Sequence, residues 1–328
     1  MRAKSKLRYA VVFLVFLIVL MVIAVAKYKK TQDERNQVRE ENYKVIGITG
    51  GLGNQMFQYA LSLALANESN CNVYYDLSFY EEENQLNSPT VEEMLNNPEL
   101  SKFNAKRKFS LKNFNINYQT ADKEKIERCT SKIDGNVIKE VGIQNFNNGK
   151  HEYILDYFET LELFDYEKYR DTFTREFTIK VDMDEKNKEM LKNIKDTDSI
   201  AVHIRRTDHG GLGFTSLKYY DKAVNYMVSK VESPHFFVFS DDLNWVKENF
   251  KLDYPHTVVD INSDSTNYFD FELMKNCKHH IIANSTFSWW AAWLNPNKEK
   301  IVIAPTPWFQ WSERNEMMPK DWVRIKDD

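Results

Sequence analysis

Cysteine is scarce in this chain, and so is any excess of positive charge. The 328 residues include 3 cysteines, which can form at most one disulfide bond, so a disulfide framework is excluded. No cysteine and histidine spacing is typical of a zinc site. The formal net charge is −4, whereas a nucleic-acid-binding surface needs a basic stripe. These absences exclude a disulfide-stapled scaffold and argue against nucleic acid as a partner.

Long hydrophobic runs are absent except for one near the amino terminus. Residues 9–26 carry no charge and are rich in Val, Leu, Ile and Phe, which is just long enough to span a bilayer as a helix. The basic residues that precede the run are Arg2, Lys4, Lys6 and Arg8. They favour a cytoplasmic amino terminus and a translocated remainder. We expect a cytoplasmic tail at residues 1–8, a transmembrane anchor and a stem at residues 27–43, with a cleaved signal peptide as the alternative.

Short apolar strands alternate with amphipathic helices through most of the remaining chain. The predicted strands are residues 44–49, 72–75, 199–204, 235–239, 257–260, 279–283 and 301–304. Residues 81–150 are polar and rich in asparagine, and their weak periodicity predicts no elements. The alternation predicts an α/β fold of two doubly wound, Rossmann-like halves, residues 44–195 and 196–328. A cleft between two such halves is where a nucleotide ligand normally binds.

Two arginines and a histidine leave the strand 199–204 together, in the run His203-Ile204-Arg205-Arg206-Thr207-Asp208. Desolvation of a guanidinium group is costly unless an anion pairs with it. Its N–H donors can form two parallel hydrogen bonds with phosphate oxygens. An internal ion-pair network around Asp208 is the alternative. Two arginines and a histidine for one acid leave unmatched positive charge, which favours a phosphate-bearing ligand. The ends of strands are also where open α/β sheets bind ligands.

A glycine-rich loop, Gly50-Gly51-Leu52-Gly53-Asn54, joins the first predicted strand to a helix. Glycine lets the backbone turn tightly and approach a ligand, and the amino terminus of a helix offers free N–H groups. A tight turn without a ligand explains the glycines equally well. The loop is not a Walker motif, because no Gly-Lys-Ser/Thr follows it.

Carboxylates follow the strand 235–239, in the run Ser240-Asp241-Asp242. At a strand end they suit hydrogen bonds from ribose hydroxyls or base N–H groups. The same residue types are common helix N-caps, and the sequence leaves both interpretations open.

A polar row opens the helix near residue 286. Its members are Asn284, Ser285, Thr286 and Ser288, and their amide and hydroxyls suit a phosphate or sugar hydroxyls. The tryptophans that follow, Trp289, Trp290 and Trp293, are expected mostly in the core.

With these residues in view, the chain resembles the α-1,2-fucosyltransferase family of inverting, GDP-fucose-dependent enzymes. The segments that carry the resemblance are GGLGNQMFQYA, HIRRTD, FSDDLNWVK and ELMKNCKHHIIANSTFSWWAAWLN, and they follow the family's order. The resemblance covers residues 44–309. It implies a GT-B fold, GDP-fucose as donor and no divalent metal. In animals it also implies a type II membrane protein of the Golgi with a lumenal catalytic domain.

The resemblance also implies roles for individual residues. His203 and Arg205 would contact the diphosphate of GDP, Arg206 would support the site, and Asp241 or Asp242 would lie near the guanosine. The residues that would hold phosphate or fucose hydroxyls are Asn284, Ser285, Thr286 and Ser288. The residues that would close over the cleft from the other half are Gly51, Gly53, Asn54 and Gln55. The chain departs from the family at His209, where Tyr is common, and at Glu159, where Gln is commoner. These departures leave the reaction intact, but the resemblance then does not define the acceptor.

Two Asp-x-Asp runs, Asp182-Met183-Asp184 and Asp196-Thr197-Asp198, imitate the metal motif of many sugar transferases. Both lie in hydrophilic stretches between elements, so we expect solvated loops. Carboxylates usually accompany a magnesium-bound diphosphate, whereas the cradle predicted here is cationic. We therefore expect no metal ion and no other cofactor.

The resemblance implies transfer of fucose to the 2-hydroxyl of a terminal galactose, with inversion, and the residues of the cationic cradle agree with a diphosphate donor. We expect Arg205, His203 and Asp208 to act in catalysis. The base for the acceptor hydroxyl stays open among Asp208, His209 and Glu159. The predicted partners are GDP-fucose, a galactose-terminated glycan and, through the anchor, a membrane. The alternatives are transfer to a protein or a non-galactose glycan, and an inactive membrane-tethered glycan-binding protein.

Overall fold

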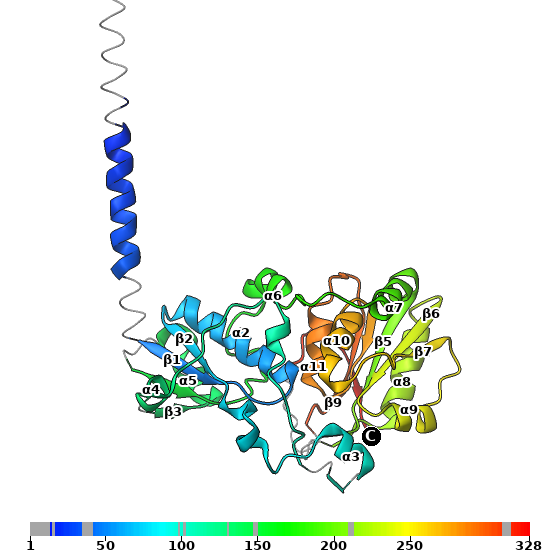
Figure 1. The fold of residues 1–328 in the computed structure, drawn as a ribbon. Coiled ribbons are helices and arrows are strands. Elements are labelled where there is room, and N and C mark those ends of the chain that lie inside the picture. Colours follow the sequence, from blue (N-terminus) through cyan, green and yellow to red (C-terminus); the bar gives the residue numbers. More distant parts are fainter. Residues whose placement is uncertain are drawn as a thin grey trace, which may run out of the picture.

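The structure is a computed structural model that describes residues 14, 17–34, 42–97, 99–100, 103–129, 131–146, 150–208, 213–309 and 316–328. Figure 1 shows two α/β halves side by side, with the amino-terminal half in blue to green and the carboxyl-terminal half in light green to red. Each half is built on one sheet, and all strand pairs in both sheets are parallel. The predicted α/β fold with parallel sheets is therefore confirmed.

The sheet of the amino-terminal half has the strand order β2-β1-β4-β3. Its strands are β1 (Tyr43–Gly47), β2 (Asn72–Asp76), β3 (Ser131–Ile133) and β4 (Glu152–Ile154). All of β1 is buried, including Lys44, whose ammonium lies 2.9 Å from the Glu152 carboxylate and donates to the Lys150 carbonyl. Strand β1 is central, with β2 on one side and β4 on the other. The loops after β1 and β4 therefore flank a topological switch point, where α/β sheets bind ligands.

The sheet of the carboxyl-terminal half has the order β7-β6-β5-β8-β9-β10. Its strands are β5 (Asp198–Ile204), β6 (Pro234–Ser240), β7 (His256–Val258), β8 (His279–Ile281), β9 (Val302–Thr306) and β10 (Val323–Lys326). The chain builds outward from β5 first in one direction and then in the other, as doubly wound folds do. The loops after β5 and β8 flank the switch point of this half.

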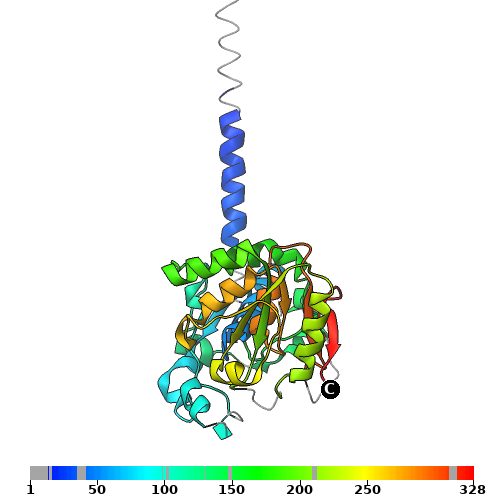
Figure 2. The ribbon, with the colours of Figure 1, turned by 90° about the vertical axis from the view of Figure 1, so that its right-hand side faces the viewer.

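Helices cover both sheets, as Figures 1 and 2 show. They are α2 (Leu52–Glu68), α3 (Val91–Asn96), α4 (Lys123–Glu127), α5 (Gly135–Val141), α6 (Arg170–Glu176), α7 (Glu185–Asp196), α8 (Leu217–Val228), α9 (Leu243–Asn249), α10 (Asn267–Lys275) and α11 (Thr286–Trp293). The short 3-10 turns are Ser78–Tyr80, Glu82–Gln85, Leu111–Asn113, Ile143–Asn145, Glu167–Tyr169 and Asp264–Thr266.

Helices α2 and α11 pack against each other where the two halves meet. The ring of Phe57 on α2 lies 4.9 Å from the rings of both Trp289 and Trp290 on α11, centroid to centroid. All three side chains are fully buried, and Trp293 is nearly so, which confirms that these tryptophans belong to the core. One hydrophobic cluster therefore continues from one half into the other and fixes the two switch points relative to each other.

Residues 17–34 are helical and stand away from the two halves in Figures 1 and 2. Their apolar side chains are exposed, with Met21 at 70% and Val22 at 61%. Among the residues that the structure describes, no helix is both long enough and apolar enough to cross a membrane. Residues 9–13, 15 and 16 of the expected anchor lie outside the described residues, so the anchor stays a prediction.

Candidate functional site

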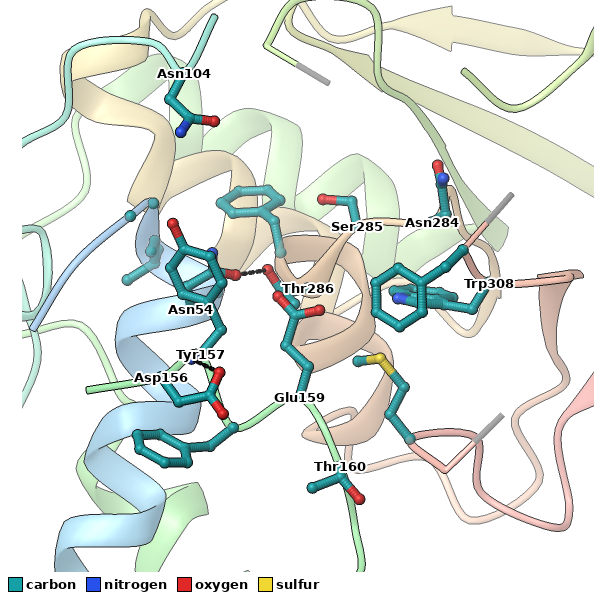
Figure 3. A pocket seen from close by; sticks show the side chains of 18 of the residues that line it. Asn54, Asn104, Asp156, Tyr157, Glu159, Thr160, Asn284, Ser285, Thr286 and Trp308 are labelled. Atoms are coloured by element: carbon teal, nitrogen blue, oxygen red, sulfur yellow. Dashed lines mark hydrogen bonds between the residues drawn. The ribbon is translucent and has the colours of Figure 1, made fainter. Parts of the chain in front are cut away.

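Two cavities of about 630 Å³ each meet between the halves. The first, here called the inter-half cavity, is bounded by the loops after β1 and β4 and by the start of α11 (Figure 3). The second, here called the β5–β6 cavity, lies beyond the carboxyl ends of those two strands. The residues that line both cavities are Arg107, Arg205, Asn267 and Phe287. A ligand with a polar middle and two different ends fits this arrangement.

The glycine loop brings the starts of α2 and α11 into contact. Gly50 has a φ of +74°, a conformation that favours glycine. A Cβ at Gly53 would lie 2.4 Å from the carbonyl carbon of Thr286, so only glycine fits there. The Thr286 hydroxyl donates to the Asn54 side-chain oxygen at 2.6 Å, as the dashed line in Figure 3 shows. Gly50, Gly53 and Asn54 all line the inter-half cavity. Glycine is required at position 53 because the other half approaches so closely, and not because a ligand does.

Gln55 does not close over the cleft, contrary to the expectation from the sequence. Its side chain is fully buried and lines neither cavity. The amide nitrogen donates to the carbonyls of Gly50 and Lys108, and the amide oxygen accepts from the N–H groups of Ser110 and Leu111. Because all of these groups are internal, Gln55 fixes the glycine loop to the segment that carries Arg107.

Arg107 and Arg205 form the wall that the two cavities share. Both guanidinium groups pair with Asp208, and the Nε of Arg205 lies 3.1 Å from Asp241. Arg107 also lies 3.5 Å from Asp264. The expectation of unmatched positive charge is therefore wrong, because it counted Asp208 alone. The ion-pair alternative is present, and yet the arginine side chains keep 12% and 19% of their surface exposed, toward the cavities.

Each guanidinium keeps donors for a ligand. A guanidinium has five N–H groups. Within the described residues, the Nη1 of Arg205 and the Nε of Arg107 form no ion pair or hydrogen bond. Burial lowers the pKa of both groups, with the neighbouring carboxylates acting in the opposite direction, but an arginine stays charged at neutral pH. Two buried cations with spare donors can hold a phosphate between the cavities.

Arg107 is the principal site residue that the sequence did not reveal. It comes from residues 81–150, where no periodicity placed an element. Gln85 fixes its backbone, since the Gln85 amide oxygen accepts from the Arg107 N–H at 2.6 Å and the amide nitrogen donates to the Arg107 carbonyl at 2.9 Å. A single basic residue in a polar segment gives no pattern that could have singled it out.

His203 lies at the floor of the β5–β6 cavity and is 4% exposed. Its Nδ1 is 2.9 Å from the hydroxyl of Ser288, which is fully buried and lines neither cavity. Ser288 therefore orients His203. The expectation that Ser288 holds a ligand directly is wrong for this structure, because Ser288 lines neither cavity.

Asp241 organises the loop that follows β5. It accepts from the backbone N–H groups of Arg206 and Thr207, at 2.7 and 3.1 Å, and from the Thr207 hydroxyl. Burial acts to raise the pKa of Asp241, but the charge of Arg205 and these hydrogen bonds outweigh it, so the pKa lies below its usual range. Asp241 also lines the β5–β6 cavity.

Asp242 and Arg206 have structural partners of their own. Asp242 caps α9 by accepting from the Trp245 N–H at 2.9 Å, which is the capping interpretation, and it lines the β5–β6 cavity as well. The guanidinium of Arg206 lies between the rings of Phe214 and Trp245, at 4.2 and 3.9 Å from their centroids. It lines neither cavity, so Arg206 is not brought to the site with Arg205.

The start of α11 faces the inter-half cavity. Asn284 is held there by the Thr215 hydroxyl and by the Gly213 carbonyl. Ser285 occupies the N-cap position, but its side chain makes no capping hydrogen bond, and Figure 3 shows it directed into the open space. Free N–H groups of a helix start and this hydroxyl can bind an anion beside Arg205.

Of the three candidate bases, Glu159 alone stands in the inter-half cavity without a described cation beside it. Burial, followed by the nearby charge of Asp156, raises the pKa of Glu159 to about 7. Asp208 is engaged by both arginines. His209 lies outside the described residues. The sequence favoured none of the three as the base. The surroundings of Asp208 and Glu159 favour Glu159 over Asp208, and His209 stays a prediction.

Two doubly wound halves that meet over a polar, arginine-walled double cavity are suited to bind a nucleotide-bearing ligand at their switch points. The chain belongs to glycosyl transferase family 11, whose sequence profile matches residues 11–326. An α-1,2-colitosyltransferase of Escherichia coli is 33% identical over 305 residues, 86% of this chain and 98% of that protein. The O-antigen biosynthesis glycosyltransferase WbnK of Escherichia coli is 29% identical over 85% of this chain and 99% of its own length.

More distant relatives match a smaller part. Human galactoside α-(1,2)-fucosyltransferase 1 is 28% identical over 142 residues, 38% of each chain. Among solved structures, NodZ α-1,6-fucosyltransferase soaked with GDP-fucose is 15% identical and aligns with 78% of this chain and 93% of its own, with a TM-score of 0.44.

Proposed function

We propose that this glycosyltransferase moves L-fucose from GDP-β-L-fucose to the 2-hydroxyl of a terminal galactose, inverting the anomeric carbon without a metal ion. The observation that carries the proposal is the pair of buried arginines, Arg107 and Arg205, shared by two cavities. A nucleoside diphosphate sugar has the matching layout, with an uncharged group at each end of a dianionic diphosphate. Membership of family 11 and the resemblance of the motifs support the donor and the linkage.

In this arrangement the nucleoside occupies the β5–β6 cavity, near His203 and Asp242, and the diphosphate lies against the shared wall. The transferred sugar and the acceptor then meet in the inter-half cavity. As the acceptor oxygen bonds to the anomeric carbon, the bond from that carbon to the β-phosphate oxygen breaks, and negative charge grows on the departing phosphate. Arg107, Arg205 and the start of α11 are placed to stabilise that charge, which is the largest single contribution in many enzymes.

A second donor, GDP-colitose, is supported by a specific relative. The colitosyltransferase of Escherichia coli matches 86% of this chain and nearly its own whole length, whereas the galactoside fucosyltransferases match about half of this chain or less. Both sugars would leave the same diphosphate, so the arginine wall does not distinguish them.

We also propose that residues 9–26 tether the enzyme to a membrane, with the catalytic halves on the far side. In a eukaryotic host, the resemblance would place those halves in the Golgi lumen.

The test is GDP release from purified enzyme with EDTA present. GDP-fucose and GDP-colitose are each offered with and without a β-galactoside, and the linkage of the product is determined by NMR. Release from GDP-fucose that depends on the galactoside and yields an α-1,2 product is expected. Faster turnover of GDP-colitose would replace the donor, and release indifferent to galactose would replace the acceptor. Failure to bind either GDP-sugar would overturn the proposal, and activity that appears only after Mg²⁺ is restored would overturn its metal independence.

A further inference from the structure

Among the described residues that line the inter-half cavity, one carboxylate is not used by the fold. Glu159 lies in the loop after β4, at the switch point of the amino-terminal half. Within the described part of the chain, its carboxylate forms no hydrogen bond and no ion pair, unlike Asp156 in the same loop, which accepts from the N–H groups of Gly135 and Tyr157. Figure 3 shows the Glu159 side chain reaching into the cavity toward the start of α11, whereas Thr160 is directed away from it.

The position of this carboxylate matches a requirement of the reaction. In the proposed function, the departing phosphate lies against Arg205 and the start of α11. The acceptor must attack from the opposite side of the sugar if the configuration is to invert. Glu159 comes from the other half of the molecule and faces the start of α11 across the cavity. It therefore stands on the side from which the acceptor would enter.

We propose that Glu159 is the catalytic base that takes the proton of the attacking acceptor hydroxyl. The proposal rests on the proposed function. The hydroxyl oxygen forms a bond to the anomeric carbon, and the electron pair of the broken bond leaves with GDP. The hydroxyl proton passes to the Glu159 carboxylate and from there to solvent.

The charged groups around the cavity leave Glu159 free for this role. Lys139 of α5 pairs with Glu162 and with Glu316, and the two arginines pair with Asp208 and other carboxylates. The titratable neighbours on its own loop are Asp156 and Tyr157. Burial raises the pKa of Glu159 to about 7, and Asp156 adds to the rise, so the group is both ionised and basic near neutral pH.

Substitution of Glu159 by glutamine distinguishes a catalytic base from a group that only binds the sugar. Glutamine is also the commoner residue at this position in the family that the chain resembles. Glu159→Gln keeps the shape and can still hydrogen-bond a sugar hydroxyl, but it accepts no proton. If Glu159 is the base, the variant lowers kcat by roughly 10²- to 10⁴-fold while the affinity for GDP-fucose stays within about threefold. The affinity also reports that the variant is folded. The matched control is Glu140→Gln on the exposed surface of α5, which should retain wild-type kcat.

The pH profile provides the second measurement. A base acts when ionised, so wild-type kcat/KM should rise with pH through about 7, the pKa of Glu159 in the free enzyme. Removal of the neighbouring charge by Asp156→Asn should move that rise to lower pH, and Glu159→Gln should abolish it. A purely structural role would not produce these shifts.

The outcomes are separable. Wild-type enzyme that transfers the sugar while Glu159→Gln matches its kcat, raises only KM, or keeps the rise near pH 7 overturns Glu159 as the base and leaves the proposed function standing. Wild-type enzyme that neither binds GDP-fucose nor transfers from it overturns the proposed function, and this proposal falls with it.

Discussion

At the scale of single residues, each of the two arginines in the shared wall has a structural role and a ligand-binding role. Arg107 and Arg205 neutralise Asp208 and Asp241, and they also face both cavities. Buried ion pairs of this kind are costly to break because they leave an uncompensated charge. The arginines are thus held in place before a ligand arrives, which is the preorganisation that electrostatic catalysis requires.

Arg205→Ala tests the phosphate assignment. Loss of its donors should lower kcat by roughly two to three orders of magnitude, because charge on the departing phosphate is no longer stabilised. Steady-state kinetics of GDP release measure this, with Arg175→Ala on the exposed part of α6 as the control, since its side chain is 67% exposed. Turnover equal to wild type would mean that the diphosphate lies elsewhere.

Asp270→Asn tests a buried charge in the β5–β6 cavity. Burial raises the pKa of Asp270 to about 7, and its partner is the Asn262 amide at 2.7 Å. The folded chain therefore holds a proton that the unfolded chain releases from about pH 4 upward, so this group makes stability fall as pH rises toward 7. Asparagine carries no charge, and the variant should gain about 1–3 kcal/mol of unfolding free energy at pH 8 and little at pH 4.

Denaturant unfolding at the two pH values measures the gain, and Asp253→Asn on the exposed surface serves as the control. An equal effect of Asp270→Asn at both pH values would show that the Asp270 carboxylate is not desolvated.

At the scale of secondary-structure elements, the contact between the starts of α2 and α11 joins the halves. Gly53→Ala places a Cβ 2.4 Å from the Thr286 carbonyl carbon, so the two helices must separate. We expect a loss of about 1–3 kcal/mol, typical of overpacking, together with lower activity because the inter-half cavity changes shape.

Gly51→Ala is the matched control for this prediction. Its Cβ would lie 3.8 Å from the Nε of Arg107, an ordinary contact, and its φ of −81° suits alanine. The change should cost less than about 1 kcal/mol, the usual effect at an N-cap. Thermal unfolding of both variants makes the comparison. If both melt at the same temperature, the close approach of the helices is not what requires glycine.

The same elements show what a sequence can reveal. Strands β5, β6 and β8 were predictable because each is an apolar run that ends in polar residues, and this pattern also located His203 and Ser285. Strands β3 and β4 are as short as β8, but their sequences, SKI and EYI, each begin with polar residues and border a polar, asparagine-rich stretch, so no apolar run marks them. The pairing of Asp208 with Arg107 joins positions about a hundred residues apart, so no local pattern reports it. Sequence therefore identified the loops of the site but neither their charge balance nor the reason for Gly53.

At the scale of the whole molecule, the catalytic halves and the amino-terminal segment differ in how much apolar surface they expose. The halves bury their apolar residues in continuous clusters. The helix at residues 17–34 makes its exposed apolar side chains available instead, with Ile18, Val22 and Ile23 each more than half exposed. Such a surface is unfavourable in water at about 25 cal/mol per Å² and is stabilised when it enters lipid.

Membrane attachment can be tested by comparing the full chain with a chain that starts at Thr31. The full chain should sediment with membranes and resist extraction by high salt and carbonate, because the run at residues 9–26 holds it by apolar contact rather than by charge. The shortened chain should remain in the supernatant with unchanged kcat, since both cavities are lined only by residues from position 50 onward in the described chain. Carbonate release of the full chain would contradict a spanning anchor, and loss of transfer in the shortened chain would show that the segment contributes to the catalytic halves.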